Sequence, residues 1–348
     1  MDHDVVIAGL GPVGALLALR LTSAGMSVLV VERALSPYPL PRAIAADDEV
    51  QEILARVDPG LVAGMLHDQP VRFVSGDREI GTIRFPRSAG GFSGLSFFHQ
   101  PTLEAGLQKL LPCPVRRGVA LTGFAADDTG VSVRLDDGAE VRAGWLVGCD
   151  GAGSTVRNLA GIPWRGRDLP HRWHVVDCEG SYRDGFTYSC DPALPTVDMP
   201  MPGGHRWEFL LRGPEQPPRV PLPVVRATDY PYGTRHAAEW VQGRVVLAGD
   251  AAHTMPPFAG QGLGAGLRDA WALGSLLPRG EVERYQRLRA PHVREMTRLS
   301  LLVGAVLQAR RGTAARDALL RNAFRAPGLG PWLRRGGPRR PASGVLDL

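Results

Sequence analysis

The residues best suited to bind a phosphate-bearing ligand lie in a glycine-rich turn near the N-terminus. Gly9, Gly11 and Gly14 have G-x-G-x-x-G spacing and separate an apolar strand from an apolar helix. Glycines at these positions permit a tight turn, the close approach of a pyrophosphate and close packing of helix on strand. The next predicted strand ends in Glu32, near the spacing of about 20 residues expected for a carboxylate that holds a ribose. We predict a dinucleotide site, although NAD(P) and FAD both use this turn.

A second glycine-rich segment follows an apolar strand predicted at 245–248. The strand leads into Gly249 and Asp250, and Pro257 comes soon afterwards. Alternate glycines then open a predicted helix: Gly260, Gly262, Gly264 and Gly266. Such glycines expose backbone N–H groups to a flat or anionic ligand, and Asp250 could accept a hydroxyl of a cofactor chain. The alternative interpretation is a strand-to-helix turn that holds no ligand.

Three further motifs bear on which dinucleotide binds. They are DGAGSTVR, which contains Asp150 and Arg157 after an apolar strand, FHQPTLEAGL with Gln100, and LPRAIAADDE with Arg42. Together with GDAAHTMPPFAGQG, these stretches resemble the class A flavoprotein monooxygenases of the para-hydroxybenzoate hydroxylase type. Within that group the chain is similar to the branch that includes 3-(3-hydroxyphenyl)propionate hydroxylase. The resemblance covers nearly the whole chain.

The resemblance implies an α/β fold. In it, a Rossmann-like FAD-binding domain of the GR2 type is interleaved with a smaller β-sheet substrate domain and followed by C-terminal helices. The FAD-binding domain is expected at 1–70, 98–168 and 240–280, the substrate domain at 71–97 and 169–239, the helices at 281–326 and a tail at 327–348. FAD is the implied cofactor. NADH or NADPH would visit as a transient electron donor, because the sequence has no second G-x-G-x-x-G.

The resemblance also assigns individual residues to FAD. The pyrophosphate and adenosine would be held by Gly9, Gly11, Pro12, Val13, Gly14, Glu32, Arg33 and Leu121. The middle of the cofactor and the nicotinamide approach would involve Arg42, Gln100, Asp150 and Arg157. The ribityl chain and the flavin would contact Gly249, Asp250, Pro257, Gly260, Gly262, Leu263 and Gly264. A purely structural role stays open for Arg42 and Gln100 and, above all, for Arg157.

The sequence departs from the family pattern at three places. Gly264 stands where the family usually has Asn, which would keep a backbone contact and lose side-chain bracing. Leu194 stands where close relatives often carry Arg, so a carboxylated phenylpropanoid substrate is less favoured. The segment between Arg212 and Tyr230 is short and proline-rich, where relatives usually have a longer helical insert. We therefore expect an open substrate pocket, with an aromatic polyketide or other secondary metabolite as one candidate substrate.

The implied reaction is hydroxylation of a phenolic or polyketide-like aromatic molecule with NAD(P)H and molecular oxygen through a C4a-hydroperoxyflavin. Amides after Gly260 would stabilise anionic reduced flavin. Apolar walls would exclude water, and the candidates are Met199, Met201, Trp207, Phe209 and Pro257. Spacing marks no base for a phenol, and the weak candidates are Tyr188, His174 and Asp198. Epoxidation, Baeyer–Villiger insertion, an NAD(P) dehydrogenase and a flavin-binding protein without turnover remain alternatives.

Composition, net charge and cysteine spacing limit the classes of binding partner that the sequence suggests. The chain has 348 residues, 44% of them hydrophobic, and a formal net charge of +5. No basic stripe with interleaved aromatic residues suggests nucleic acid, and no apolar run reaches the length of about 18 residues that predicts a membrane span. The four cysteines lack C-x-x-C or metal spacing, so we expect free thiols in a reducing, cytoplasmic compartment and no metal site. Nothing in the sequence indicates an oligomeric state.

Local patterns predict the remaining elements. Alternation of apolar and polar residues predicts strands of the substrate domain at 71–74, 82–85, 174–176 and 207–211. The turn at 136–138 predicts a hairpin of strands 131–135 and 140–142, separate from a strand at 146–150. Helical spacing predicts one or two helices at 281–309 and a short one at 316–324. The chain from Gly328 onward is expected to be loose.

Overall fold

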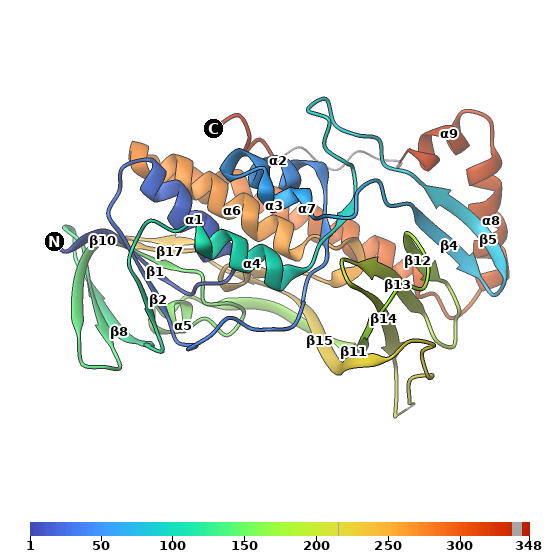
Figure 1. Ribbon diagram of the computed structural model, residues 1–348, viewed down its shortest axis with the longest axis horizontal. Coiled ribbons are helices and arrows are strands. Elements are labelled where there is room, and N and C mark those ends of the chain that lie inside the picture. Colours follow the sequence, from blue (N-terminus) through green and yellow to red (C-terminus); the bar gives the residue numbers. More distant parts are fainter. Residues whose placement is uncertain (215, 336–342) are drawn as a thin grey trace.

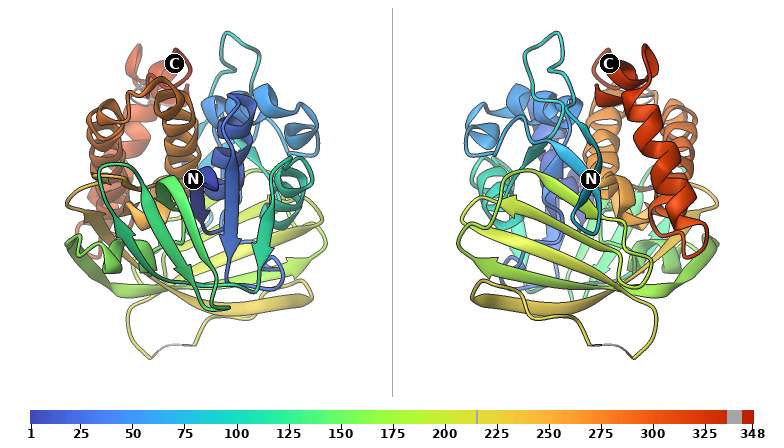
Figure 2. Two further views of the ribbon diagram at one scale, coloured as in Figure 1. Left: turned by 90° about the vertical axis from the view of Figure 1, so that its left-hand side faces the viewer. Right: turned by 90° about the vertical axis from the view of Figure 1, so that its right-hand side faces the viewer.

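The computed structural model describes residues 1–214, 216–335 and 343–348. In this part of the chain, two eight-stranded sheets lie along the long axis of the molecule, and most of the helices gather on one side of them (Figures 1 and 2). The described helices are α1 Pro12–Ser23, α2 Asp48–Val57, α3 Gly60–Ala63, α4 Gln100–Lys109, α5 Thr155–Leu159, α6 Gly262–Leu276, α7 Glu283–Leu307, α8 Thr313–Arg325 and α9 Leu329–Arg334. The mixed α/β fold predicted from the sequence is confirmed.

The first sheet has the strand order β16-β17-β10-β1-β2-β7, and β9 and β8 continue it from β10. Its strands are β1 His3–Ala8, β2 Val28–Glu32, β7 Val115–Arg117, β8 Leu121–Ala126, β9 Val131–Leu135, β10 Glu140–Gly148, β16 Val241–Gln242 and β17 Val245–Leu247. β1 runs parallel to β2 and β10, and β10 runs parallel to β17. The carboxyl ends of these strands therefore meet at one edge, where α/β sheets bind ligands. The predicted hairpin is present, but its second strand and the strand predicted at 146–150 are one strand, β10.

The N-terminal glycines allow backbones to touch where β1, α1 and β10 meet. A Cβ added to Gly14 would lie 2.0 Å from the Gly9 carbonyl oxygen, and one added to Gly9 would lie 2.5 Å from the Cys149 carbonyl oxygen. Gly9 also has a φ of 102°, which L side chains rarely adopt. A side chain at Gly14 would push α1 away from the turn after β1, and one at Gly9 would clash with the backbone that follows β10.

The second glycine-rich segment packs against the first. Cβ atoms added to Gly249 and Gly266 would lie 3.0 and 2.7 Å from Val13 Cγ2, so α6 and the turn before it rest on the start of α1. The two turns, far apart in sequence, are neighbours in space (Figure 1). A continuous site built from both is therefore possible.

The second sheet has the strand order β18-β15-β11-β14-β13-β12-β4-β5. Its strands are β4 Val71–Ser75, β5 Arg78–Ile83, β11 Trp164–Glu179, β12 Phe186–Ser189, β13 Thr196–Met201, β14 Gly204–Leu211, β15 Val224–Ala237 and β18 His253–Thr254, while β3 Ala45–Ala46 and β6 Ser96–Phe97 pair separately. Trp173, Met199 and Leu210 pack with Phe258 on one face. Trp207 and Phe209 pack with Leu222 on the other face, beneath the segment that leads into β15.

The C-terminal region agrees with the sequence prediction in one element and differs from it in another. The stretch 281–309, predicted as one or two helices, forms a single helix, α7, whereas residues 329–334 form α9 where a loose chain was expected. Gly330 allows α9 to approach the end of α8, because a Cβ added to it would lie 2.2 Å from the Phe324 carbonyl oxygen. This tertiary contact is invisible to local composition. Residues 336–342 of the predicted tail lie outside the described residues, and within those described no helix has both the length and the apolar character needed to cross a membrane.

Candidate FAD site

A pocket of about 320 Å³ lies at the carboxyl ends of β1, β2 and β10. The predicted residues that line it are Gly9, Gly11, Glu32, Arg33, Arg42, Leu121 and Asp150. Gly11 is the N-cap of α1, so the unpaired N–H groups of the first helical turn point toward the pocket. Arg33, Arg42 and Arg117 add positive charge to the lining, which suits a pyrophosphate.

Glu32 is positioned by backbone groups of two neighbouring segments. One carboxylate oxygen accepts a hydrogen bond from Leu10 N at 2.7 Å, and the other accepts one from Ala34 N at 2.8 Å. A carboxylate oxygen has a second lone pair. Glu32 can therefore accept two ribose hydroxyls while it keeps both backbone contacts.

One oxygen of the Asp150 carboxylate, which lines the pocket, has no hydrogen-bond donor in the described structure. Its Oδ2 accepts a hydrogen bond from Val156 N at 3.1 Å, while its Oδ1 is buried with no hydrogen-bond partner in the described structure. Leaving a buried acceptor unpaired costs about 1–3 kcal/mol. A hydroxyl or a bridging water of a bound cofactor would remove that cost, so the residues present fit a dinucleotide.

The second turn presents Asp250 and the start of α6. Asp250 is exposed to solvent, yet the protein around it desolvates its carboxyl and raises its pKa; His253 and Arg42 oppose that shift, and Asp269 adds to it. Gly262, Leu263 and Gly264 form the first turn of α6, so their N–H groups are available to an anionic or electron-rich ring.

Several predicted residues have structural contacts and do not line the pocket. Gln100 Oε1 accepts hydrogen bonds from Arg42 N and Ala43 N at 3.1 and 2.7 Å, and its amide donates to Glu104. Arg157 donates to the carbonyl of Ala251 and stacks 3.9 Å above the Trp164 ring. Gln100 therefore shapes the segment that carries Arg42, and Arg157 braces the turn that carries Asp250. The remaining predicted residues outside the lining are Pro12, Val13, Gly14, Gly249, Asp250, Pro257, Gly260, Gly262, Leu263 and Gly264.

The pocket also contains residues that the sequence did not single out. They include Tyr38, Glu104, Arg117 and Thr155. Glu104 is 4% exposed, and burial raises the pKa of its carboxyl, although the hydrogen bond from Gln100 opposes this shift. Glu104 follows Gln100 by one helical turn, so the i, i+4 rule places both on one face of α4. That spacing was the signal available for Glu104; the other three had none.

All three proposed bases have protein partners, and one of them lies on the face of the second sheet away from Phe258. The Tyr188 hydroxyl donates to the Phe258 carbonyl at 2.9 Å, and burial raises the pKa of Tyr188 far above its usual value. Asp198 is 2% exposed and accepts from Arg183 Nε at 2.7 Å. His174 alternates with Trp173 along β11 and so lies on the opposite face of the sheet from Phe258, where Asp229 contacts its ring at 2.8 Å. A role of any of the three as the base stays a prediction.

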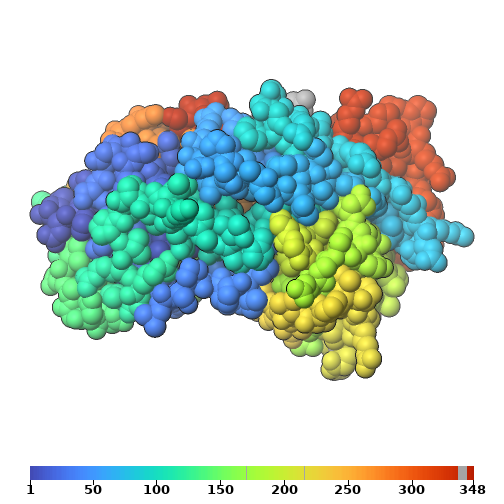
Figure 3. Space-filling view, in the orientation of Figure 1, coloured from blue at the N-terminus to red at the C-terminus, as the bar shows by residue number. Residues whose placement is uncertain are grey.

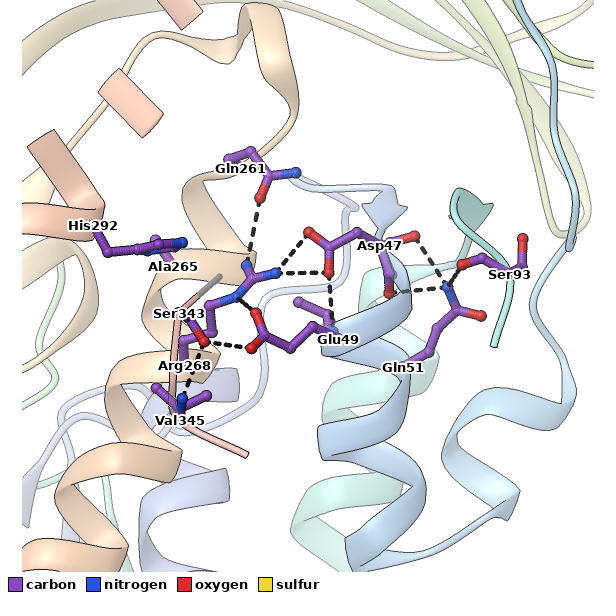
Figure 4. Close-up of polar contacts among 12 residues, drawn as sticks. Asp47, Glu49, Gln51, Ser93, Gln261, Ala265, Arg268, His292, Ser343 and Val345 are labelled. Atoms are coloured by element: carbon purple, nitrogen blue, oxygen red, sulfur yellow. Dashed lines mark hydrogen bonds and ion pairs between the residues drawn. The ribbon is translucent and has the colours of Figure 1, made fainter. Parts of the chain in front are cut away.

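A buried charge cluster fixes the first turns of α6 (Figure 4). Arg268 donates two hydrogen bonds of 2.8 Å to Asp47, which caps α2, and a further one to Glu49. Ser343 also donates to Glu49, so the described end of the chain joins the cluster. Because these partners come from α2, α6 and residues 343–348, the cluster holds the helix start that would face the flavin.

Comparison with known proteins agrees with this geometry. The FAD binding domain family matches residues 2–185 and 210–299. A 3-(3-hydroxy-phenyl)propionate/3-hydroxycinnamic acid hydroxylase of Mycobacterium sp. (strain JLS) is 35% identical over 94% of this chain, and the chain spans 65% of that relative's length. The p-nitrophenol 4-monooxygenase PnpA from Pseudomonas putida DLL-E4 has a TM-score of 0.81 at 23% identity over 92% of this chain and 93% of its own.

A second solved structure holds the cofactor itself. Aklavinone-11 hydroxylase, in a ternary complex with FAD and aklavinone, has a TM-score of 0.76 at 24% identity over 99% of this chain and 72% of its own. The family resemblance predicted from the sequence is confirmed, with FAD as the cofactor. The chain belongs to the FAD binding domain family.

Proposed function

We propose that this protein is an FAD-dependent monooxygenase that hydroxylates an aromatic small molecule with NAD(P)H and molecular oxygen. The observation that carries the proposal is the meeting of two remote glycine turns beside an apolar sheet face, where Asp150 Oδ1 is buried without a hydrogen-bond partner in the described chain. The names of the relatives, among them a hydroxylase of 3-hydroxyphenyl compounds and a nitrophenol monooxygenase, support an aromatic substrate. We place the protein in the cytoplasm, because its four cysteines are free.

Residues of both turns would divide the work of binding FAD. Glu32 and Asp150 would accept ribose and other hydroxyls at one end, and Asp250 would accept a hydroxyl near the ring. When bound, FAD supplies electron transfer from NAD(P)H and activation of oxygen. The N–H groups at the start of α6 would stabilise negative charge on the ring side nearest to them.

The apolar face of the second sheet would exclude water from the reacting ring. Met199 and Met201 share the buried cluster of Phe258, beside the turn at Pro257. Trp207 and Phe209, which the sequence also suggested as walls, belong to the opposite face, because successive strand residues alternate. The wall of this site therefore comes from alternate residues of β13 and β14 and from the turn after β17.

The test of this function begins with the purified protein, which should be yellow or become so with added FAD. An aromatic substrate should accelerate NAD(P)H oxidation, and NMR should identify a hydroxylated ring and separate it from an epoxide or an inserted oxygen. Glu32→Ala should weaken FAD retention at least 10-fold, the loss expected for hydrogen bonds to a charged group of about 1.5–3 kcal/mol. A protein that never retains FAD, or oxidises NAD(P)H to peroxide alone with every phenol, would refute the proposal.

A further inference from the structure

Glu208 lies on the face of the second sheet that packs against the second glycine turn. The strand register places Val175, Glu208 and Thr228 in one row across β11, β14 and β15. Side chains alternate along a strand, so Glu208 shares its face with Arg206 and Leu210. Leu210 belongs to the same buried cluster as Phe258, which fixes the direction of this face.

The rows on either side of Glu208 are covered by the segments that would hold the flavin. On one side, Arg206 donates to the carbonyls of Arg42 and Pro41 at 2.8 and 2.6 Å. On the other side, the Trp173 ring lies 6.2 Å from that of Phe258. A Cβ added to Gly260 would lie 3.4 Å from Ala45 Cβ, so the covering segments adjoin. In the space-filling view, blue atoms of the N-terminal part of the chain lie beside yellow atoms from the later part of the chain (Figure 3).

The Glu208 carboxylate has no hydrogen bond from any residue of the described chain. Its only ion contact there is Arg206 Nη1 at 3.7 Å, and that guanidinium is already held by Asp177 through bonds of 2.6 and 3.0 Å. The Glu208 side chain is 17% exposed. A carboxylate accepts hydrogen bonds but cannot donate them. The Glu208 carboxylate can therefore accept a hydrogen bond from a donor group of a ligand.

Tyr230, in the adjoining row of β15, has the same character. It is 47% exposed, yet burial within the surrounding protein raises its pKa to about 12, an effect to which Asp250 and Glu208 add and which Arg42 opposes. Burial likewise raises the pKa of Glu208, with Arg206 opposing and Asp177 adding. Both Glu208, on the sheet, and Asp250, at the glycine turn, thus act electrostatically on the same Tyr230 side chain.

We propose that Glu208 accepts the hydrogen bond of a hydroxyl on the substrate ring and takes its proton as the ring is hydroxylated; this inference rests on the proposed function. The O–H bond breaks, its electron pair stays on the substrate oxygen, and a Glu208 oxygen gains the proton, which solvent later removes. Attack on the ring makes the hydroxyl far more acidic, so a carboxylate suffices as the base. A second negative charge beside Glu208 would be repelled, so the site prefers neutral phenols over carboxylated ones.

The activity test compares Glu208→Gln with Glu179→Gln in the FAD-loaded protein. Glu179 is an exposed glutamate at the end of β11 and serves as the matched control. With 3-methylphenol, Glu208→Gln should lower kcat by about 100-fold or more, the usual contribution of general base catalysis. The acid limb of the pH profile should disappear, and the preference for 3-methylphenol over 3-hydroxybenzoate should shrink. FAD content and melting temperature should match those of the control.

A binding measurement separates this inference from the proposed function. The absorbance of bound 4-nitrophenol reports its ionisation, and the carboxylate of Glu208 should raise the pKa of the bound phenol above its value in water. Glu208→Gln should abolish that increase, and Glu179→Gln should leave it unchanged. An unchanged increase in Glu208→Gln, or wild-type kcat with 3-methylphenol, would overturn the role of Glu208 even if the protein hydroxylates phenols. A Glu208-dependent increase without any hydroxylated product would instead leave Glu208 in place and refute the proposed function.

Discussion

Asp250 and Asp269 belong to the same glycine-rich segment, but their surroundings shift their pKa values in opposite directions. Asp269 is fully buried; burial would raise its pKa, but His253 and Arg289 outweigh that effect and lower it. Asp250 is exposed, and desolvation by the surrounding protein raises its pKa against the weaker opposition of His253 and Arg42.

The difference lies in the hydrogen-bond partners. Asp269 accepts from His253 Nε2 at 2.5 Å, Arg289 Nε at 2.9 Å and Gly249 N at 3.2 Å. In the described chain, no group donates a hydrogen bond to the carboxylate of Asp250. The hydrogen bonds and ion pairs of Asp269 hold parts of the fold together. The carboxylate of Asp250 has no such partner and can accept a hydrogen bond from a ligand.

The largest expected effect on stability comes from removing the charge of Asp269. Asp269→Asn leaves Arg289 buried without its counter-ion, and breaking such a pair costs about 3–5 kcal/mol. We expect the free energy of unfolding to fall by that amount in chemical denaturation of the FAD-free protein. A loss below about 1 kcal/mol would mean that the cluster is not what holds α6 to α7.

The contribution of Asp269 should also be visible in how the free energy of unfolding depends on pH. Because the pKa of Asp269 is lowered on folding, its contribution is fully present above its unfolded pKa of about 3.9 and is lost as pH falls through the lower folded value. The difference in unfolding free energy between wild type and Asp269→Asn should thus be constant from neutral pH to about pH 5 and should narrow only below about pH 4. Narrowing that began near neutral pH would contradict the assignment of the effect to the carboxyl of Asp269.

Removing the charge of Asp250 should weaken FAD binding without lowering the stability of the fold. Asp250→Asn should leave the unfolding free energy of the FAD-free protein unchanged or raise it by at most about 1 kcal/mol, because the charged form is disfavoured there and solvent screens it. FAD affinity should fall about 10- to 100-fold through the loss of a charged acceptor, measured by fluorescence titration. Equal losses of stability and affinity would place Asp250 in the same structural class as Asp269.

Sequence reasoning succeeded where a short stretch of chain determines the structure. The turn at Gly9, Gly11 and Gly14 and the carboxylate of Glu32 are local features, and the structure places them together at one sheet edge. The family resemblance added the expectation that the second turn joins them, and Gly266 packed on Val13 provides the contact.

Sequence reasoning failed where the answer depends on what covers a surface. Alternation along β14 shows that Trp207 and Glu208 lie on opposite faces, but only the packing of Phe258 shows which face is the site. The partners of Arg268, such as Asp47 and Glu49, come from a distant helix that no spacing connects to it. Nothing in the sequence shows that the Tyr188 hydroxyl donates to a backbone carbonyl.

The smallest expected effect tests how tightly the satisfied region is packed. A Cβ added to Gly264 would lie 2.9 Å from Arg268 Nη1 and 3.1 Å from Val50 Cγ2, whereas one added to Gly262 would meet nothing within 4 Å. Alanine improves helix propensity by about 1 kcal/mol at either position, so Gly262→Ala should raise the unfolding free energy slightly. Gly264→Ala must displace a guanidinium held by Asp47, and overpacking of about 1–3 kcal/mol should cancel or reverse that gain. Matched denaturation curves would show the sign, and equal stabilisation by both substitutions would mean that Arg268 moves freely and does not clamp α6.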